Sequence, residues 1–274
     1  MEIVSISGIP IEYQASGTGE PVVLIHGALI ADAFGPLMEE PDVKGRFNFI
    51  TYHRQGYHGS GRSDPPITIE RQASDLRSLL QSLGIRKAHV LGHSFGGVVA
   101  LELALSSPDV VQSLLLLEPA LLISDSAQGY RDSLLHVVEE YESGNVVALV
   151  DGVWQARFGA NYRSFLDRAL PGGFDEAVAN AEAAVRIDMP SLIEWSFTEE
   201  KARRVLQPTL SVLGADSPAL WSRFQETHDA LLRWLPNCEG FVLPRATHAL
   251  QIQNPRDMAR AMAAFLARHP IDTA

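Results

Sequence analysis

The residues Gly92-His93-Ser94-Phe95-Gly96 form a Gly-x-Ser-x-Gly sequence whose serine is a candidate nucleophile. The short apolar run 88–91 precedes it and the apolar run 98–105 follows it, which predicts a strand, an abrupt turn and a helix. Such a turn forces the serine into a strained backbone conformation, and the flanking glycines avoid the clashes that side chains would cause. The pattern therefore predicts a catalytic serine. The alternative is a glycine-rich turn that only packs a helix on a sheet.

A serine hydroxyl is a poor nucleophile until a base takes its proton. The chain has 9 histidines, and we predict that His248 is the base. It follows the apolar run 239–243 by a short loop, so it sits at the end of a predicted strand, where ligands bind in open α/β sheets. It also comes after Ser94 in chain order, as this type of turn requires. His93 is expected to pack beside the turn, and His26 to brace its own loop.

Acyl transfer also builds negative charge on the former carbonyl oxygen, and this charge needs hydrogen-bond donors that are already in position. The backbone N–H of Phe95, directly after the serine, is one candidate donor. The backbone N–H of Ala28, which follows His26-Gly27 after an earlier apolar run, is the other. Alternatively, the small side chain of Ala28 leaves room above the nucleophile.

Charge and composition narrow the classes of partner. The 274 residues carry a formal net charge of −11, which disfavours nucleic acid and anionic membrane surfaces as general partners. No apolar stretch approaches the length of a membrane span, and residues 1–5 show no secretory leader. The single cysteine, Cys238, excludes an internal disulfide and is interpreted as incidental. We expect a cytoplasmic protein; its oligomeric state is left open.

No histidine or cysteine spacing is typical of a metal site, so neither a metal nor a cofactor is expected. His53 and His58 flank the unusual segment 54–61. They are interpreted as loop residues, with a position at the border of a pocket as the alternative.

The rest of the chain alternates between short apolar runs and segments with helical periodicity. Helices are expected at 68–83, where Gly84 marks the end, and at 254–267, where Pro255 suits the first turn. Runs at 22–25, 47–52, 88–91, 111–117, 209–213 and 239–243, with an edge hairpin at 2–7 and 10–15, are the expected strands. This alternation predicts an α/β fold with a mostly parallel, eight-stranded sheet covered by helices on both faces.

One interval interrupts this alternation. Residues 124–204 contain helix-like stretches separated by Gly and Pro, without a convincing strand. We therefore predict a core formed by residues 1–122 and 205–274 and a helical cap, residues 123–204, inserted between core strands. The cap is rich in large aromatic groups, most of which are expected to pack between cap and core while a minority line a pocket. These are Trp154, Phe158, Phe165, Phe174, Trp195 and Phe197.

The strand order, the Gly-x-Ser-x-Gly turn, His26-Gly27 and the His248 loop together resemble the α/β-hydrolase fold family. The chain is most similar to its cap-bearing branch, which includes small esterases, lactonases and carbon–carbon bond hydrolases. The resemblance covers nearly the full length and is weakest across the cap. It implies a Ser-His-acid triad, and a serine at this position argues against epoxide hydrolase or haloalkane dehalogenase chemistry.

The acid of the implied triad is where the sequence departs from the family pattern. Members commonly carry Gly-x-x-Asp-Pro after the strand that matches 209–213, but here the run is Gly214-Ala215-Asp216-Ser217-Pro218, with Asp216 one place early. The other candidate is Glu118, which closes the very apolar run 111–117 at the strand end where some relatives place their acid. A carboxylate that ends a buried strand needs a partner. The sequence leaves open whether Glu118 or Asp216 is the acid of the triad.

The prediction is a carboxylesterase-like serine hydrolase that acts on an ester-like small molecule through an acyl-enzyme intermediate. Carbon–carbon bond hydrolysis, acyl transfer and lyase chemistry on the same triad are alternatives. So is a catalytically slow ligand-binding protein on this scaffold, because a fold alone does not fix a function.

Overall fold

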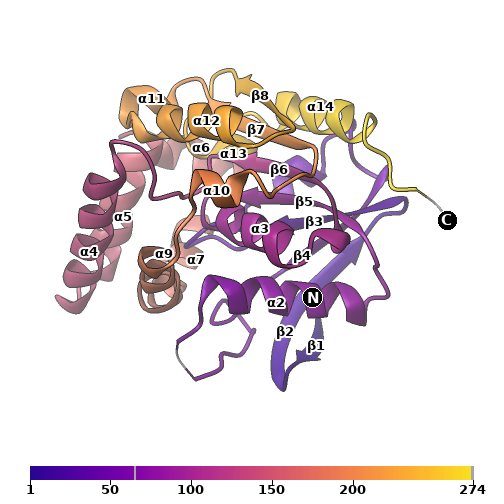
Figure 1. Ribbon diagram of the computed structural model, residues 1–274. Helices are drawn as coiled ribbons and strands as arrows, with labels where there is room; N and C mark the ends of the chain where they lie inside the picture. The colour runs from indigo at the N-terminus through magenta and orange to yellow at the C-terminus, as the bar shows by residue number, and fades with distance from the viewer. Residues whose placement is uncertain (65, 273–274) are drawn as a thin grey trace.

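The sheet contains eight strands in the order β1-β2-β4-β3-β5-β6-β7-β8 (Figure 1). The computed structural model describes residues 1–64 and 66–272. The strands are β1 (Glu2–Ile6), β2 (Ile9–Ser16), β3 (Glu20–Ile25), β4 (Phe47–Tyr52), β5 (Ala88–His93), β6 (Val111–Leu117), β7 (Thr209–Gly214) and β8 (Cys238–Leu243). β2 pairs antiparallel with β1 and β4, and the other neighbours are parallel. The predicted fold class, with its edge hairpin, is confirmed.

Helices cover both faces of the sheet, and the alternating side chains of β3 show how. Val23 and Ile25 pack in one apolar cluster with residues of α2, α3 and α12, whereas Val22 and Leu24 pack in another with α1 and α14. Successive side chains of a strand point to opposite faces, so one buried strand supplies both layers. These helices are α1 (Gly35–Met38), α2 (Ile69–Ser82), α3 (Phe95–Ser106), α12 (Arg223–Trp234) and α14 (Pro255–Leu266).

Local signals set the ends of the helices that the sequence predicts. The Thr68 hydroxyl accepts the N–H of Arg71 at 3.2 Å and caps α2. Gly84, with φ of +70°, follows the end of that helix. The Asn254 side chain caps α14 in the same way.

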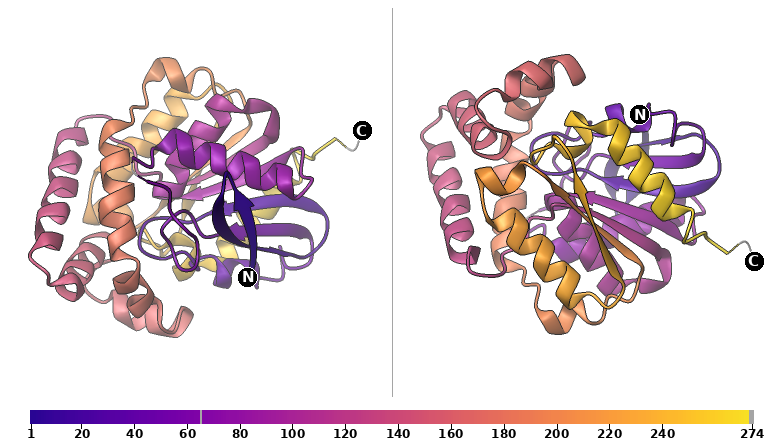
Figure 2. Two further views of the ribbon diagram at one scale, coloured as in Figure 1. Left: turned by 90° about the horizontal axis from the view of Figure 1, so that it is seen from below. Right: turned by 90° about the horizontal axis from the view of Figure 1, so that it is seen from above.

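Every regular element that the structure describes between β6 and β7 is helical. A short turn of 3₁₀ helix, η1 (Pro108–Val110), precedes β6. Figure 2 shows the helices between β6 and β7 gathered beside the sheet, beyond one end of its strands. They are α4 (Ala127–Glu142), α5 (Val146–Phe158), α6 (Tyr162–Ala169), α7 (Gly173–Ala179), α8 (Ala181–Ala183), the π-helix η2 (Ala184–Asp188), α9 (Met189–Glu194) and α10 (Glu199–Ala202). The short helices α11 (Ser217–Leu220) and α13 (Leu250–Gln253) follow β7 and β8. Among residues 1–64 and 66–272, none of the helices combines the length and apolar character that a membrane crossing requires.

Candidate active site

Ser94 lies in an abrupt turn between β5 and α3. Its φ of 52° and ψ of −117° are an unusual conformation for a residue other than glycine. A side chain at Gly92 would collide with the backbone oxygen of Gly96, and one at Gly96 would collide with the carbonyl of Ile25. The Ser94 N–H donates to the Leu117 carbonyl at 2.9 Å, so the end of β6 holds the turn. The glycines therefore allow the close approach that the sequence predicted.

His248 reaches the serine from the loop after β8. Ser94 Oγ lies 3.0 Å from His248 Nε2, and His248 Nδ1 lies 2.6 Å from Glu118 Oε2. The His248 ring stacks near Phe158 and Phe224 and is only 2% exposed. Burial lowers the pKa of His248 well below its usual value, and the positive charges of Arg223 and Arg157 act in the same direction. Both effects favour the neutral base.

Glu118 occupies the end of β6, where its φ of 43° turns the chain away from the sheet. It is 2% exposed, and the Gly214 N–H donates to its Oε1 at 2.8 Å. Burial raises the pKa of Glu118 to about 7, while Ser217, the Gly214 N–H and the charge of Arg223 act in the lowering direction. β5, β6 and β8 are parallel members of one sheet, so Ser94, Glu118 and His248 meet at the edge where their carboxyl ends lie.

The two candidate acids occupy different surroundings. Asp216 is exposed at the start of α11, and its N–H donates to the Ala246 carbonyl at 2.9 Å. Ser217, at the position where the family pattern in the sequence has aspartate, is buried beside Glu118. Of the two carboxylates, it is Glu118 that contacts the His248 ring. The hydrogen bond from the Gly214 N–H places the Glu118 carboxylate beside the end of β7.

Arg223, the first residue of α12, is a buried cation that sequence reasoning missed. It is 1% exposed, and its guanidinium carbon lies 4.0 Å from the ring centroid of Tyr130 and 4.3 Å from that of Phe224. Its charge lowers the pKa of both Glu118 and His248, which favours the carboxylate paired with a neutral imidazole. No local sequence signal marks this arginine, because its aromatic contacts come partly from α4.

The two predicted oxyanion donors line the same cavity as Ser94. Phe95 is the first residue of α3, so its N–H has no acceptor within the helix. Ala28 lies in the loop that His26 braces, with Nδ1 2.7 Å from the Gly27 oxygen and Nε2 3.1 Å from the Arg54 nitrogen. Burial lowers the pKa of His26 well below its usual value, so this bracing histidine is neutral.

His93 packs beside the turn and contacts the backbone of the candidate base. Its Nε2 lies 2.8 Å from the His248 carbonyl oxygen, and burial lowers its pKa to about 3. A neutral His93 with a proton on Nε2 donates to that carbonyl. His93 therefore positions the loop that carries His248.

The cavity at this site has a volume of about 60 Å³ and is lined by residues of both the sheet end and the helical segment. Of the six aromatic residues singled out in the sequence, Trp154 and Phe158 line it. Trp195 instead packs on Phe197 and donates its indole N–H to Glu102 at 2.9 Å. The lining residues are Ala28, Leu29, His93, Ser94, Phe95, Ala120, Tyr130, Leu134, Val153, Trp154, Arg157, Phe158, Asp188, Met189, Leu192 and His248.

A buried ion pair joins the loop after β4 to the helical segment. Arg54 Nη1 and Nη2 donate to the two carboxylate oxygens of Asp188 at 2.6 and 2.8 Å. Tyr57 donates to the same carboxylate at 2.6 Å and accepts the Leu29 N–H at 3.3 Å. Arg54 Nη2 also donates to the Gly27 oxygen at 3.1 Å. This network holds the backbone on both sides of Ala28 against the helical segment, and sequence reasoning did not identify it.

Comparisons with known proteins agree with this architecture. A family model described as the alpha/beta hydrolase family matches residues 22–261. The chain is 24% identical over 268 residues to 2-hydroxy-6-oxo-6-(2'-aminophenyl)hexa-2,4-dienoic acid hydrolase of Metapseudomonas resinovorans, covering 97% of this chain and 90% of that protein. Among solved structures, a thermophilic esterase from Thermogutta terrifontis with malate bound has a TM-score of 0.82 at 23% identity, covering 98% of this chain and 100% of that one. An esterase from Exiguobacterium antarcticum has a TM-score of 0.82 at 18% identity, covering 96% and 97%.

Proposed function

The chain belongs to the α/β-hydrolase family, and from this premise we propose that it is a serine hydrolase that cleaves small ester-like substrates through an acyl-enzyme. The observation that carries the proposal is the continuous hydrogen-bonded series from Ser94 through His248 to Glu118, at 3.0 and 2.6 Å. In this assignment Ser94 is the nucleophile, His248 the general base and Glu118 the acid. Asp216 has no role in the triad.

In the first half-reaction, His248 Nε2 takes the proton of Ser94 Oγ as that oxygen attacks the substrate carbonyl carbon. The N–H groups of Ala28 and Phe95 stabilise the negative charge on the carbonyl oxygen. Glu118 keeps the other imidazole proton on Nδ1 and stabilises the imidazolium. When the tetrahedral intermediate collapses, His248 returns a proton to the leaving alkoxide.

In the second half-reaction, His248 takes a proton from water, and the resulting hydroxide attacks the acyl carbon. The bond to Ser94 Oγ breaks, His248 gives the proton back to that oxygen, and the free acid leaves. The reaction consumes one water and needs no further reactant.

The charge in the cavity favours a substrate that itself carries an anionic group. Arg157 lines the cavity, and its Nη1 donates to the Val153 carbonyl of its own helix at 3.0 Å. Among the ion pairs of residues 1–64 and 66–272, none includes Arg157, whereas the cavity carboxylate Asp188 is already paired with Arg54. A guanidinium without an ion-pair partner, in a cavity lined mostly by apolar residues, is suited to a substrate carboxylate. The Metapseudomonas resinovorans relative is likewise named for a carboxylic acid substrate.

That relative, matched over 97% of this chain, also favours a second candidate function, the hydrolysis of a carbon–carbon bond next to a ketone. The same three residues would serve, with a carbanion in place of the leaving alkoxide. Acyl transfer and lyase chemistry are further alternatives on this triad, but no feature of the site favours them.

The proposed division of the chain follows from the same site. Residues 1–122 and 205–274 form the catalytic core, and residues 123–204 form a cap that closes the cavity over Ser94. Arg157 and Asp188 then come from the cap, whereas Ser94 and His248 come from the core.

The test compares Ser94→Ala with the wild type on a panel of 4-nitrophenyl esters, a lactone and a vinylogous diketone, with the products identified. Turnover of the activated esters is expected to vanish in Ser94→Ala, while the circular dichroism spectrum stays unchanged. Ser78→Ala is the matched control, because that partly exposed hydroxyl on α2 donates to the Ser74 carbonyl of its own helix. Ester hydrolysis at the wild-type rate in Ser94→Ala would overturn the proposal, and cleavage of the diketone alone would establish the second candidate.

A further inference from the structure

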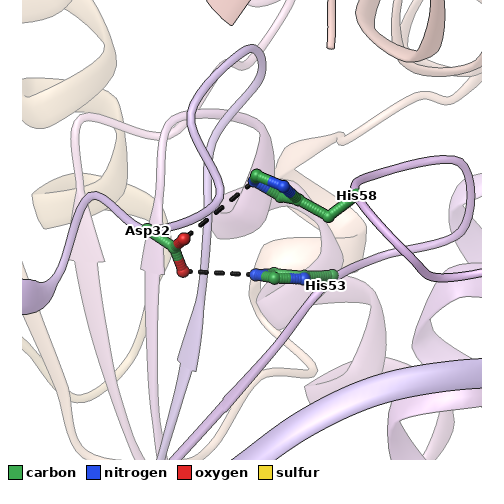
Figure 3. Close-up of side chains that lie close together, drawn as sticks. All are labelled: Asp32, His53 and His58. Atoms are coloured by element: carbon green, nitrogen blue, oxygen red, sulfur yellow. Dashed lines mark hydrogen bonds and ion pairs between the residues drawn. The ribbon is translucent and has the colours of Figure 1, made fainter. Parts of the chain in front are cut away.

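A second group of polar side chains lies outside the cavity, on loops at the same end of the sheet. Asp32 follows β3, His53 and His58 follow β4, and Glu176 belongs to α7. Figure 3 shows the Asp32 carboxylate facing the imidazole edges of both histidines. We propose that this cluster is a Zn²⁺-binding site that ties α7 to the loops of the sheet.

The ligand atoms are already near the spacing of a zinc site. His53 Nε2 lies 3.2 Å from Asp32 Oδ1, and His58 Nε2 lies 4.0 Å from Asp32 Oδ2 and 3.0 Å from Glu176 Oε1. One possible ligand atom from each of Asp32, His53 and His58 lies within 4.8 Å of the other two. Tetrahedral Zn²⁺ with bonds near 2.0–2.1 Å holds its ligand atoms about 3.3 Å apart, so modest side-chain movements suffice.

The least exposed ligand has a partner that orients it. His53 Nδ1 lies 2.8 Å from Glu12 Oε2, and the same carboxylate oxygen accepts the Gly59 N–H at 2.9 Å. With its proton on Nδ1, a neutral His53 directs the lone pair of Nε2 toward Asp32. A histidine that binds metal through one nitrogen and donates to a carboxylate through the other is the common arrangement in zinc sites.

The charge balance of the cluster also calls for a cation. Glu12, Asp32 and Glu176 supply three carboxylates, and among the described residues the ion pairs of these carboxylates are with His53 and His58 alone. The two rings stack with their centroids 4.4 Å apart, so protonating both would place two positive charges in contact. One Zn²⁺ at the Nε2 atoms offsets two of the three negative charges and leaves both imidazoles neutral, the form that binds metal.

The ligand types select the metal. Two imidazoles with two carboxylates suit Zn²⁺, whereas Ca²⁺ and Mg²⁺ prefer oxygen ligands throughout. Glu176 Oε1 also accepts the N–H of Ala31 at 2.7 Å and that of Asp32 at 3.3 Å, so α7 already contacts the loop that carries the first ligand. A bound ion would therefore strengthen an existing contact between α7 and the loop after β3.

Isothermal titration calorimetry of ZnCl₂ into the chelator-treated, tag-free full chain tests the proposal. One Zn²⁺ is expected to bind per chain. Glu12→Gln should weaken binding roughly 10- to 100-fold, as loss of an outer partner does, and Asp32→Asn and His58→Ala should weaken it further. With Co²⁺ as the probe, the wild type should show the visible absorption bands of a tetrahedral site.

His136→Ala is the matched control. It removes another exposed histidine, which pairs with Glu140 at 3.3 Å, and should leave Zn²⁺ binding unchanged. The proposal would be overturned if the wild type did not bind one Zn²⁺ per chain. It would also be overturned if Asp32→Asn and His58→Ala bound Zn²⁺ with the affinity of the wild type. Ser94→Ala should bind Zn²⁺ like the wild type, so this outcome is separate from the fate of the proposed hydrolase activity.

Discussion

Replacement of Glu118 by glutamine tests how the acid controls the base. The Gly214 N–H donates to Glu118 Oε1 at 2.8 Å, which requires an acceptor there and so keeps the amide oxygen of the glutamine at that position. The amide nitrogen then faces His248 Nδ1, where the carboxylate oxygen now lies at 2.6 Å. Because an amide nitrogen only donates, Nδ1 must give up its proton, and the proton moves to Nε2. The ring nitrogen that faces Ser94 can then no longer accept the serine proton.

The expected loss follows from this wrong tautomer. A serine protease triad whose acid becomes an amide loses roughly 10⁴-fold in kcat, which corresponds to about 5.5 kcal/mol of transition-state stabilisation. We expect a loss of that order for Glu118→Gln, measured as kcat/KM on a 4-nitrophenyl ester that the wild type hydrolyses. Asp216→Asn is the matched control and should stay close to the wild type. A Glu118→Gln variant within about tenfold of the wild type would refute the reasoning.

The position of Ser217 provides a companion variant. Its buried side chain lies beside Glu118, so Glu118→Ala combined with Ser217→Asp returns a carboxylate to the same space. The double variant is expected to be more active than Glu118→Ala alone. Equal activity of the two would show that a carboxylate at position 217 cannot reach the His248 ring.

Three further predictions concern the charges around the site. Burial raises the pKa of Glu118 to about 7, and the triad needs the Glu118 carboxylate. The value of kcat/KM should therefore fall about tenfold per pH unit below about pH 7 and level off above it. A pH profile that is flat down to about pH 5 would contradict this prediction. Arg157→Met should lower kcat/KM about 10- to 100-fold on a 4-nitrophenyl hemiglutarate but leave the uncharged pentanoate ester nearly unchanged; equal losses on both esters would remove the carboxylate role. Asp188→Asn leaves the buried Arg54 without its charged partner and should lower the free energy of unfolding, measured in urea, by about 3–5 kcal/mol. The control Glu199→Gln breaks an exposed ion pair and should lower it by about 0.5 kcal/mol. Equal effects of the two substitutions would contradict the account.

Features set by neighbouring residues could be predicted from the sequence. The turn at Ser94 depends on Gly92 and Gly96, whose missing side chains avoid contacts within a few residues and with the adjacent strand. The ends of α2 depend on Thr68 and Gly84, which act on their own helix. The alternation of strands and helices was likewise sufficient to predict the sheet class.

Features that depend on strand register and on contacts between distant residues could not be predicted from the sequence. The choice between Glu118 and Asp216 follows from where β6 and β7 end relative to the His248 loop, and the sequence pattern left it open. Arg54 and Asp188 are 134 positions apart, so no local spacing links them. His53 was interpreted as a loop residue because its carboxylate neighbours come from other segments.

Active-site labelling with a fluorophosphonate probe tests the central claim most directly, because the probe reacts with a serine whose proton a base removes. The account predicts one phosphonate adduct per chain, located by mass spectrometry on the peptide that contains Ser94, with a rate that collapses in His248→Ala. A folded wild-type chain that remains unlabelled, or carries the adduct on another residue, would contradict it.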